Sequence, residues 1–218
     1  AGEYDAEQAY QAFNDQLLTE KSTSEKAVLT SQNTYSNLFH SKGGNASYSV
    51  MANTLREIYG TDVLLATGNS FTGNVLKADY TEKMAGNMIM PNGLFAYKQE
   101  MSGAELKEMV RAFVEGYEGG LTPFNRGSLP VVSGISMEVK ENEDGYTLTD
   151  LKKDGKSVKD KDTFTVTCLA TAKHMEAFPE AQNLAFTKED APVKDAWINY
   201  VSNGDAVLAE PEDYITLR

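Results

Sequence analysis

The most regular hydrophobic pattern of the chain lies between residues 102 and 117. Apolar side chains recur there at steps of three and four, which is one face of a helix, while charged side chains take the other face. Ser102 and Glu105 have the spacing of a capping box, in which each side chain bonds the backbone N–H of the other residue. The pattern predicts a helix whose apolar stripe belongs to the core: Leu106, Met109, Val110, Phe113, Val114 and Tyr117.

The residues before this helix predict alternating helices and strands. Residues 94–101 are typical of a strand that leads straight into the capping box. Gly60 stands where a helix C-cap is expected, and the helix before it has four apolar residues on one face: Tyr48, Met51, Leu55 and Ile58. The other elements expected here are an amphipathic helix over residues 4–20, a polar break over 21–26, strands over 27–30 and 62–67, and a short helix that starts in Asp79 to Met84.

The second half of the chain changes to strand-like segments with turn residues between them. Apolar or alternating stretches cover residues 129–140, 147–151 and 163–170, and the turns at 143–145 and 154–156 predict hairpins. A last helix and a closing strand are expected from Val193, Trp197, Ile198 and Val201 and from residues 214–218. The whole pattern predicts an α+β domain with a mixed β-sheet and packed helices over residues 27–218, preceded by a helix and linker over 1–26.

Composition narrows the functional classes. The 218 residues are 41% apolar, enough for one sizeable core, and the formal net charge is -12. An acidic surface repels phosphate backbones and anionic lipid, so we expect no nucleic-acid partner and no membrane insertion. The sequence contains no run of 18 apolar residues and no signal-peptide core, so we expect a chain that is soluble or already processed.

Few residues offer catalytic chemistry. Two-metal hydrolysis needs several His and Asp side chains around a pair of ions, whereas the chain has only His40 and His174. We therefore expect no metal and no other cofactor in this chain. Cys168 is the single cysteine and falls in a strand-like segment, which predicts a buried, unreactive thiol. His40 is expected to be an exposed or hydrogen-bonded loop residue.

Five segments occur in an order that resembles one known family. These are Gly60 to Phe71 (GTDVLLATGNSF), Ala78 to Thr81 (ADYT), Met90 to Gly93 (MPNG), Met101 to Lys107 (MSGAELK) and Leu129 to Ile135 (LPVVSGI). In order and spacing they resemble the C-terminal domain of the 5'-nucleotidase family over roughly residues 27 to 218. The resemblance implies that this domain binds the nucleoside part of a substrate. It also implies a separate N-terminal metallophosphoesterase domain that holds two metal ions and performs the hydrolysis.

The ligand-binding motifs of that family are altered in this sequence. Thr67 to Thr72 replace an Asn-Gly-Gly-Gly-Ile-Arg loop, so the arginine that holds the nucleotide is absent. Asn92 replaces the phenylalanine of a Pro-Phe-Gly motif, and residues 171–177 lack the second aromatic residue and its glycine pair. Because stacking a base on an aromatic ring is worth about 1–3 kcal/mol, we expect adenosine to bind weakly unless Phe71, Phe124 or Phe178 rebuilds the aromatic plates.

If a ligand site persists, the resemblance places it where three segments converge. Its side chains would be hydroxyls, amides and cationic or aromatic groups from Thr67, Asn69, Thr72, Asn92, Lys173, His174 and Phe178. This set suits a small polar or anionic ligand. The first hypothesis is the ligand-binding domain of a secreted, periplasmic or cell-surface 5'-nucleotidase-like metallophosphoesterase, without hydrolase activity of its own. The alternative is a non-catalytic interaction or dimerisation module that has lost nucleotide binding.

Overall fold

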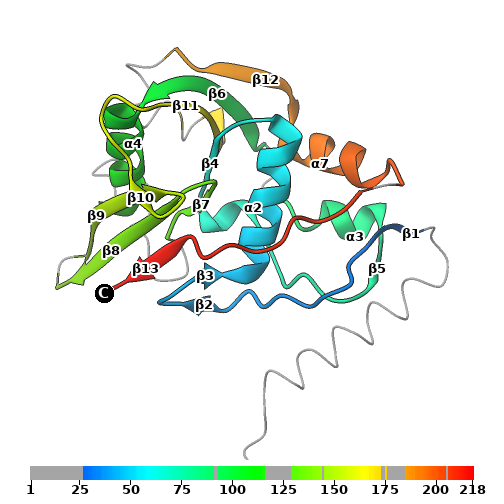
Figure 1. Cartoon of the computed structure of the whole chain (residues 1–218). Helices are drawn as coiled ribbons and strands as arrows, with labels where there is room; N and C mark the ends of the chain where they lie inside the picture. The colour runs from blue at the N-terminus through cyan, green and yellow to red at the C-terminus, as the bar shows by residue number, and fades with distance from the viewer. Residues whose placement is uncertain are drawn as a thin grey trace, which may run out of the picture.

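The computed structural model describes residues 27–90, 93–115, 129–143, 145–172, 175, 185–204 and 206–218. Two larger β-sheets, two short strand pairs and four α-helices make up these residues (Figure 1). The helix expected over residues 4–20 and the break over 21–26 lie outside the described residues. The α+β class predicted from the sequence is confirmed, although the strands divide into two mixed sheets where one had been expected.

The five-stranded sheet has the order β12-β6-β11-β4-β7. Its central strands β11 (Thr163–Ala170) and β4 (Val63–Ala66) run parallel, with Val166 opposite Val63 and Cys168 opposite Leu65. The other three pairings are antiparallel and add β6 (Phe95–Ser102), β7 (Val131–Ser133) and β12 (Thr187–Pro192). All four residues of β4 are buried, as expected for a central strand.

The four-stranded sheet has the order β10-β9-β8-β13 and contains both predicted hairpins. Its strands are β8 (Ser136–Asn142), β9 (Gly145–Lys153), β10 (Lys156–Ser157) and β13 (Ile215–Leu217), and β13 runs parallel to β8. The shorter pairs are β1 (Ala27–Thr30) with β5 (Asp79–Thr81) and β2 (Phe39–His40) with β3 (Gly44–Asn45).

Gly134 divides the apolar stretch 129–140 between the two sheets. Its φ is +77°, and a Cβ at this position would lie 2.1 Å from the carbonyl oxygen of Asp62. The left-handed conformation turns the chain sharply, and the close approach leaves no room for a side chain. The stretch therefore forms β7 in one sheet and β8 in the other.

Helix α4 (Gly103–Glu115) begins at the predicted capping box. The Ser102 N–H donates to Glu105 Oε2 at 2.7 Å, and the Glu105 N–H donates to Ser102 Oγ at 3.3 Å. The predicted stripe is buried up to Val114, and the helix packs against β9 and β6. Tyr117 lies outside the described residues.

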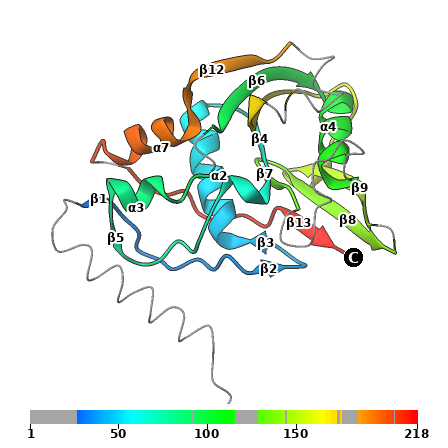
Figure 2. The same ribbon diagram turned by 180° about the vertical axis from the view of Figure 1, so that it is seen from behind.

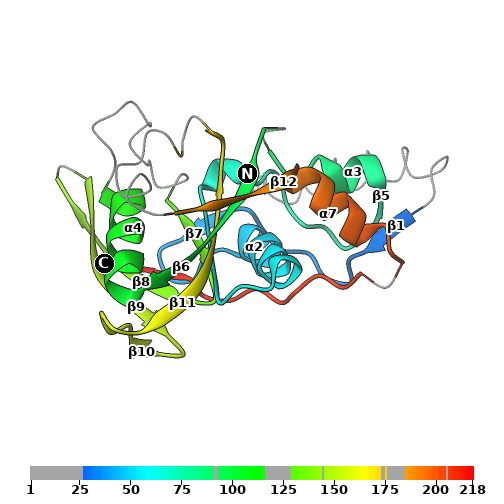
Figure 3. The same ribbon diagram turned by 90° about the horizontal axis from the view of Figure 1, so that it is seen from above.

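Helix α2 (Ala46–Tyr59) occupies the middle of the molecule, with α4 on one side and α3 and α7 on the other (Figure 3). Asn45 caps its start, and Gly60 ends it with a φ of 62°, as predicted. Its buried residues run without interruption from Ser49 to Leu55 and so cover every side of the helix. Tyr48 and Ile58, expected on the buried face, are only partly buried.

Helices α3 (Glu82–Gly86) and α7 (Val193–Val201) lie side by side (Figures 1 and 2). Trp197 is fully buried, and its indole N–H donates to the Ala85 carbonyl at 2.9 Å. Ile198, predicted to be buried, is only partly so, although its side chain packs over Gly86.

Strand β12 was not predicted. Its sequence Thr-Lys-Glu-Asp-Ala-Pro is exposed or half-buried throughout and lies at the edge of the sheet beside β6. An edge strand with charged residues and a proline resists further strand pairing, but it carries no apolar alternation. Only the pairing partner β6 identifies it as a strand.

Candidate functional site

Three connections leave the five-stranded sheet at one edge. Because β4 and β11 run parallel, their carboxyl ends meet there, and β6 starts beside them with Phe95 opposite Ala170. The connections after Ala66, before Phe95 and after Ala170 therefore begin side by side. Loops carried by a rigid sheet are common positions for ligand-binding residues. This position is named the loop edge below.

The first connection is a tight turn held against a neighbouring segment. Its 3-10 helix η1 (Gly68–Ser70) follows β4, and the Ser70 N–H donates to the Thr67 carbonyl at 2.9 Å. The Met90 N–H donates to the Ser70 carbonyl at 3.0 Å, and the Thr72 N–H donates to the Met88 carbonyl at 3.0 Å. The turn is thus fixed to the segment that leads into residues 91 and 92.

Three of the residues predicted for a ligand site lie on this turn. Thr67 is half-buried, with its hydroxyl 3.3 Å from the hydroxyl of Ser70, whereas Asn69 and Thr72 are exposed. The structure therefore places two polar side chains at the surface of the loop edge. The other predicted residues, Asn92, Lys173, His174 and Phe178, lie outside the described residues.

Residues 73–75, which follow the turn, are hydrogen-bonded to α2. Ser47, fully buried in the first turn of α2, donates its hydroxyl to the Gly73 carbonyl at 3.0 Å and accepts the Val75 N–H at 3.0 Å. Asn74 accepts the Asn37 N–H at 2.7 Å through its side-chain oxygen. The segment that follows the turn after β4 is thus hydrogen-bonded to α2, and the sequence pattern did not identify Ser47 as its support.

Phe71 is not available as an aromatic plate. Its side chain is only 3% exposed, and its ring centroid lies 5.7 Å from that of Tyr48 in a tilted arrangement. Stacking on a base requires an exposed ring face, which Phe71 lacks. Phe124 and Phe178, the other aromatic residues considered for this role, lie outside the described residues.

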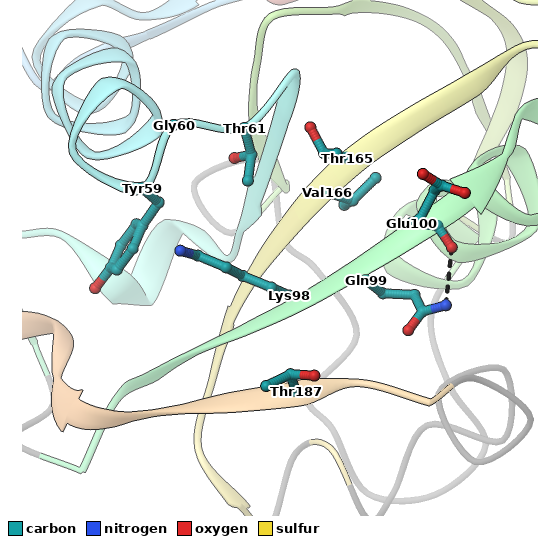
Figure 4. Close-up of a pocket in the computed structure, with 9 residues that line it drawn as sticks. All are labelled: Tyr59, Gly60, Thr61, Lys98, Gln99, Glu100, Thr165, Val166 and Thr187. Atoms are coloured by element: carbon teal, nitrogen blue, oxygen red, sulfur yellow. Dashed lines mark hydrogen bonds between the residues drawn. The ribbon is translucent and has the colours of Figure 1, made fainter.

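A pocket of about 390 Å³ lies over the other half of the same sheet (Figure 4). Its walls come from the end of α2 with the two residues that follow it, the first half of β11, the second half of β6, and Thr187 of β12. Lys98 forms an ion pair with Glu189 at 2.8 Å, and its ammonium lies 5.2 Å from the centre of the Tyr59 ring. The charge of Lys98 is therefore already compensated, which weakens this pocket as an anion site.

Two features of that pocket were missed from the sequence. Lys98 and Glu100 alternate on a strand that the pattern marked only as a strand, and these polar positions were the available signal. The hydroxyl of Tyr59 is buried and has no hydrogen-bond partner among the described residues. Burial and the nearby Glu189 carboxylate raise the pKa of Tyr59, so the phenol stays protonated.

Nucleophilic and metal chemistry find little support in the described part of the chain. Cys168 is fully buried in β11, as predicted, and burial raises the pKa of its thiol to about 12. A thiol with that pKa forms almost no thiolate at neutral pH. His40 is exposed, but it lies in the short strand β2 and not in a loop, because it pairs with Gly44 of β3. Within the described ranges no three His, Cys, Asp or Glu side chains are placed to hold a metal ion.

None of the helices in the described residues is long and apolar enough to cross a lipid bilayer. This finding agrees with the expected lack of membrane insertion for the described residues only, since the other residues were not tested.

The sequence profile of the 5'-nucleotidase C-terminal domain matches residues 22–179. No curated protein sequence matches the chain.

Several solved structures share the fold at low sequence identity. A 5'-nucleotidase precursor from Thermus thermophilus is 13% identical with a TM-score of 0.65, and covers 97% of this chain and 43% of its own. The NAD nucleotidase of Haemophilus influenzae is 15% identical with a TM-score of 0.64. The match covers 100% of this chain and 42% of the nucleotidase. A sulfate thiohydrolase, also from Thermus thermophilus, is 12% identical with a TM-score of 0.59. The match covers 96% of this chain and 38% of the thiohydrolase. The chain thus spans less than half the length of each of these proteins.

Proposed function

Because the chain belongs to the family of 5'-nucleotidase C-terminal domains, we propose that it is the ligand-binding domain of a 5'-nucleotidase-like metallophosphoesterase. The ligand binds at the loop edge, and a separate N-terminal domain holds the two metal ions and performs the hydrolysis. Such a protein acts outside the cytoplasm, in a secreted, periplasmic or cell-surface form.

The observation that supports this proposal most directly is the convergence of three connections at one edge. Parallel pairing of β4 and β11 aligns the turn after Thr67 with the connection after Ala170, and β6 adds the connection before Phe95. The turn is rigid because its backbone bonds to residues 88–90 and because Ser47 holds residues 73–75. A ligand site needs this kind of support, since a rigid scaffold reduces the entropy lost on binding.

The chemistry of the turn favours a polar or anionic ligand over a stacked purine. Asn69 and Thr72 present an amide and a hydroxyl, while Phe71 turns its ring into the core. Asn92, Lys173, His174 and Phe178 complete the proposed site from the other two connections. The similar proteins are named for different substrates: one is a 5'-nucleotidase precursor, one an NAD nucleotidase and one a sulfate thiohydrolase. The shared fold therefore leaves the ligand open.

Titration calorimetry with AMP, ribose 5-phosphate and adenosine tests the proposal. We expect saturable binding of the two phosphate esters and weak or no binding of adenosine. Asn69→Asp adds a negative charge at the loop edge and should abolish phosphate-ester binding there. Asn199→Asp adds the same charge on the exposed face of α7 and should leave it unchanged.

Two outcomes would contradict parts of this proposal. A dissociation constant for adenosine in the low micromolar range, about -8 kcal/mol, would show that an aromatic plate has been rebuilt from residues outside those described. Robust phosphate release from nucleotides by this chain alone, with Mn²⁺, Zn²⁺ or Mg²⁺ added, would show that catalysis does not need a separate domain.

The burial of Phe71 also favours the second candidate function, an interaction or dimerisation module that has lost nucleotide binding. This function predicts no saturable binding of any of the three compounds at the loop edge, so that Asn69→Asp would leave the calorimetric titrations unchanged. It also predicts a concentration-dependent dimer, or a stable complex with another domain, in size-exclusion chromatography with light scattering.

A further inference from the structure

A second pocket, of about 340 Å³, lies at the opposite end of β4 from the loop edge. It is bounded by the last turn of α2, the β7–β8 turn at Gly134, the β9–β10 turn at Asp154 and Gly155, and residues 212 and 213. The contact between Gly134 and the Asp62 carbonyl places it beside the start of β4. We call it the Arg56 pocket.

Arg56 is held in this pocket by a chain of buried hydrogen bonds. Its Nε–H donates to Ser133 Oγ at 2.8 Å, and the Ser133 hydroxyl donates to Asn53 Oδ1 at 2.6 Å. The Asn53 amide in turn donates to the Glu210 carbonyl at 2.7 Å. Ser133 and Asn53 are 1% and 2% exposed. The guanidinium is therefore fixed by one N–H, which leaves the remaining N–H groups to other partners.

Those remaining N–H groups have no partner in the described part of the chain. The terminal nitrogens of Arg56 make no hydrogen bond there, and no carboxylate oxygen of a described residue lies within 4 Å of them. An arginine fork with two parallel N–H groups free is the geometry that binds carboxylate and phosphate in a bidentate way.

Lys153 supplies a second cation without a carboxylate partner among the residues described. Its ammonium contacts the Gly134 carbonyl at 3.4 Å and lies 5.9 Å from the centre of the Phe164 ring. Its neighbour Lys152 differs, since it is paired with Glu138. The pKa of Asp62 is lowered mainly by hydrogen bonds from Thr165, with smaller contributions from the charges of Lys153 and Arg56. Asp62 is thus an acid close to both cations, although it forms an ion pair with neither and does not line the pocket.

Three acids also line the pocket and limit what it can hold. Asp154, Glu212 and Asp213 contribute to its walls, yet none of them forms an ion pair with Arg56 or Lys153 within the described ranges. The acids exclude a large polyanion, because its outer charges would face them. They favour a small ligand that has one anionic group and carries its own hydrogen-bond donors.

We propose that the Arg56 pocket is a second binding site, specific for a small oxyanion whose oxygen atoms accept the free N–H groups of Arg56 and the ammonium of Lys153. The anionic group is a phosphoryl or a carboxylate group. The site is independent of the loop edge, since it is built from other residues at the other end of β4.

NMR titration of the ¹⁵N-labelled chain with inorganic phosphate and, separately, with acetate tests this site. Chloride keeps the ionic strength constant, because screening alone shifts the signals of exposed cations. We expect saturable shifts of the Arg56 Nε–H signal and of the Gly134 and Gly155 amides. Saturation with phosphate alone identifies a phosphoryl ligand, saturation with acetate alone identifies a carboxylate ligand, and saturation with both shows that the site accepts either group.

Variants separate this site from general charge effects. Arg56→Lys keeps the charge but loses the fork, and should weaken binding at least about tenfold. Ser133→Ala keeps the arginine but frees its Nε–H, and should weaken binding by a smaller factor. The matched control Arg111→Lys changes an arginine on α4 that is paired with Glu108, and should bind like the wild type.

Linear shifts that do not saturate with either anion would overturn the proposal, as would equal binding by the wild type and Arg56→Lys. Asn69→Asp distinguishes binding at the two sites. It is expected to abolish phosphate-ester binding at the loop edge and to leave the chemical-shift changes of Gly134 and Gly155 intact. The failure of one site is therefore visible without the failure of the other.

Discussion

Helices α2 and α4 bury their surfaces in different ways. α4 has one apolar face against the sheets and a charged face in solvent, as its sequence predicts. α2 is buried on every side through its middle, although several of its buried residues are polar: Ser47, Ser49, Asn53 and Thr54. A buried polar side chain must be hydrogen-bonded, because burying it unpaired costs several kcal/mol in an apolar environment.

Each of these four buried polar residues bonds to a distant segment of the chain. Ser47 holds residues 73 and 75, Ser49 exchanges hydrogen bonds with the backbone of Glu212, and Thr54 accepts the Ala209 N–H. Asn53 bonds Glu210 and Ser133. α4 therefore mainly covers the sheets, whereas α2 positions the connections that form both proposed ligand sites.

The largest expected effect concerns the apolar face of α4. Phe113 is 1% exposed, so Phe113→Ala removes a buried ring and leaves a cavity. The free energy of unfolding should fall by about 3–5 kcal/mol. Urea unfolding followed by circular dichroism measures it. The control Glu108→Ala, on the exposed face, removes one surface ion pair with Arg111 and should cost less than about 1 kcal/mol. Equal losses in both variants would contradict the division of α4 into two faces.

The comparison explains which elements the sequence could predict. α4, β4, β11 and the β8–β9 hairpin have patterns that follow from local periodicity and turn residues, and all were predicted. α2 was predicted as a helix, but its burial was assigned to one face, since hydrophobicity alone does not show that Ser49 and Asn53 have partners 163 and 157 residues away. The edge strand β12 and the partly buried Ile198 depend in the same way on tertiary contacts.

In the candidate sites, too, the sequence predicted what local motifs encode and missed what depends on tertiary contacts. The resemblance predicted Thr67, Asn69 and Thr72 for a ligand site, and the structure places them on one turn at the loop edge. The ring direction of Phe71 could not be predicted, because it depends on contact with Tyr48. The Arg56 pocket was missed, since its free arginine N–H groups result from a buried chain through Ser133 and Asn53 that no local motif encodes.

A smaller effect is expected at the polar face of α2. Asn53→Ala leaves the Ser133 hydroxyl and the Glu210 carbonyl without their present partner, and should lower the free energy of unfolding by about 1–3 kcal/mol. Asn199→Ala, at an exposed position of α7, should change it by less than about 0.5 kcal/mol. Denaturant unfolding of the two variants makes the comparison. A loss no larger for Asn53→Ala than for Asn199→Ala would show that the buried polar groups of α2 contribute little.

The smallest effect is expected at the start of α4, where polar contacts are exposed. Ser102→Ala removes the capping hydroxyl and should cost about 1 kcal/mol of stability. The side-chain and backbone hydrogen bonds of Ser102 hold the pKa of Glu105 below its usual range. A lowered folded-state pKa means that this contribution is present at neutral pH and is lost as pH falls through that pKa.

The pKa of Glu105, followed by NMR, should therefore rise towards its ordinary value in Ser102→Ala, and the stability difference between variant and wild type should shrink in acid. Ser102→Thr keeps the hydroxyl and should retain most of both properties. An unchanged pKa in Ser102→Ala would show that the capping box does not stabilise the carboxylate, and would leave the apolar face as the main determinant of α4.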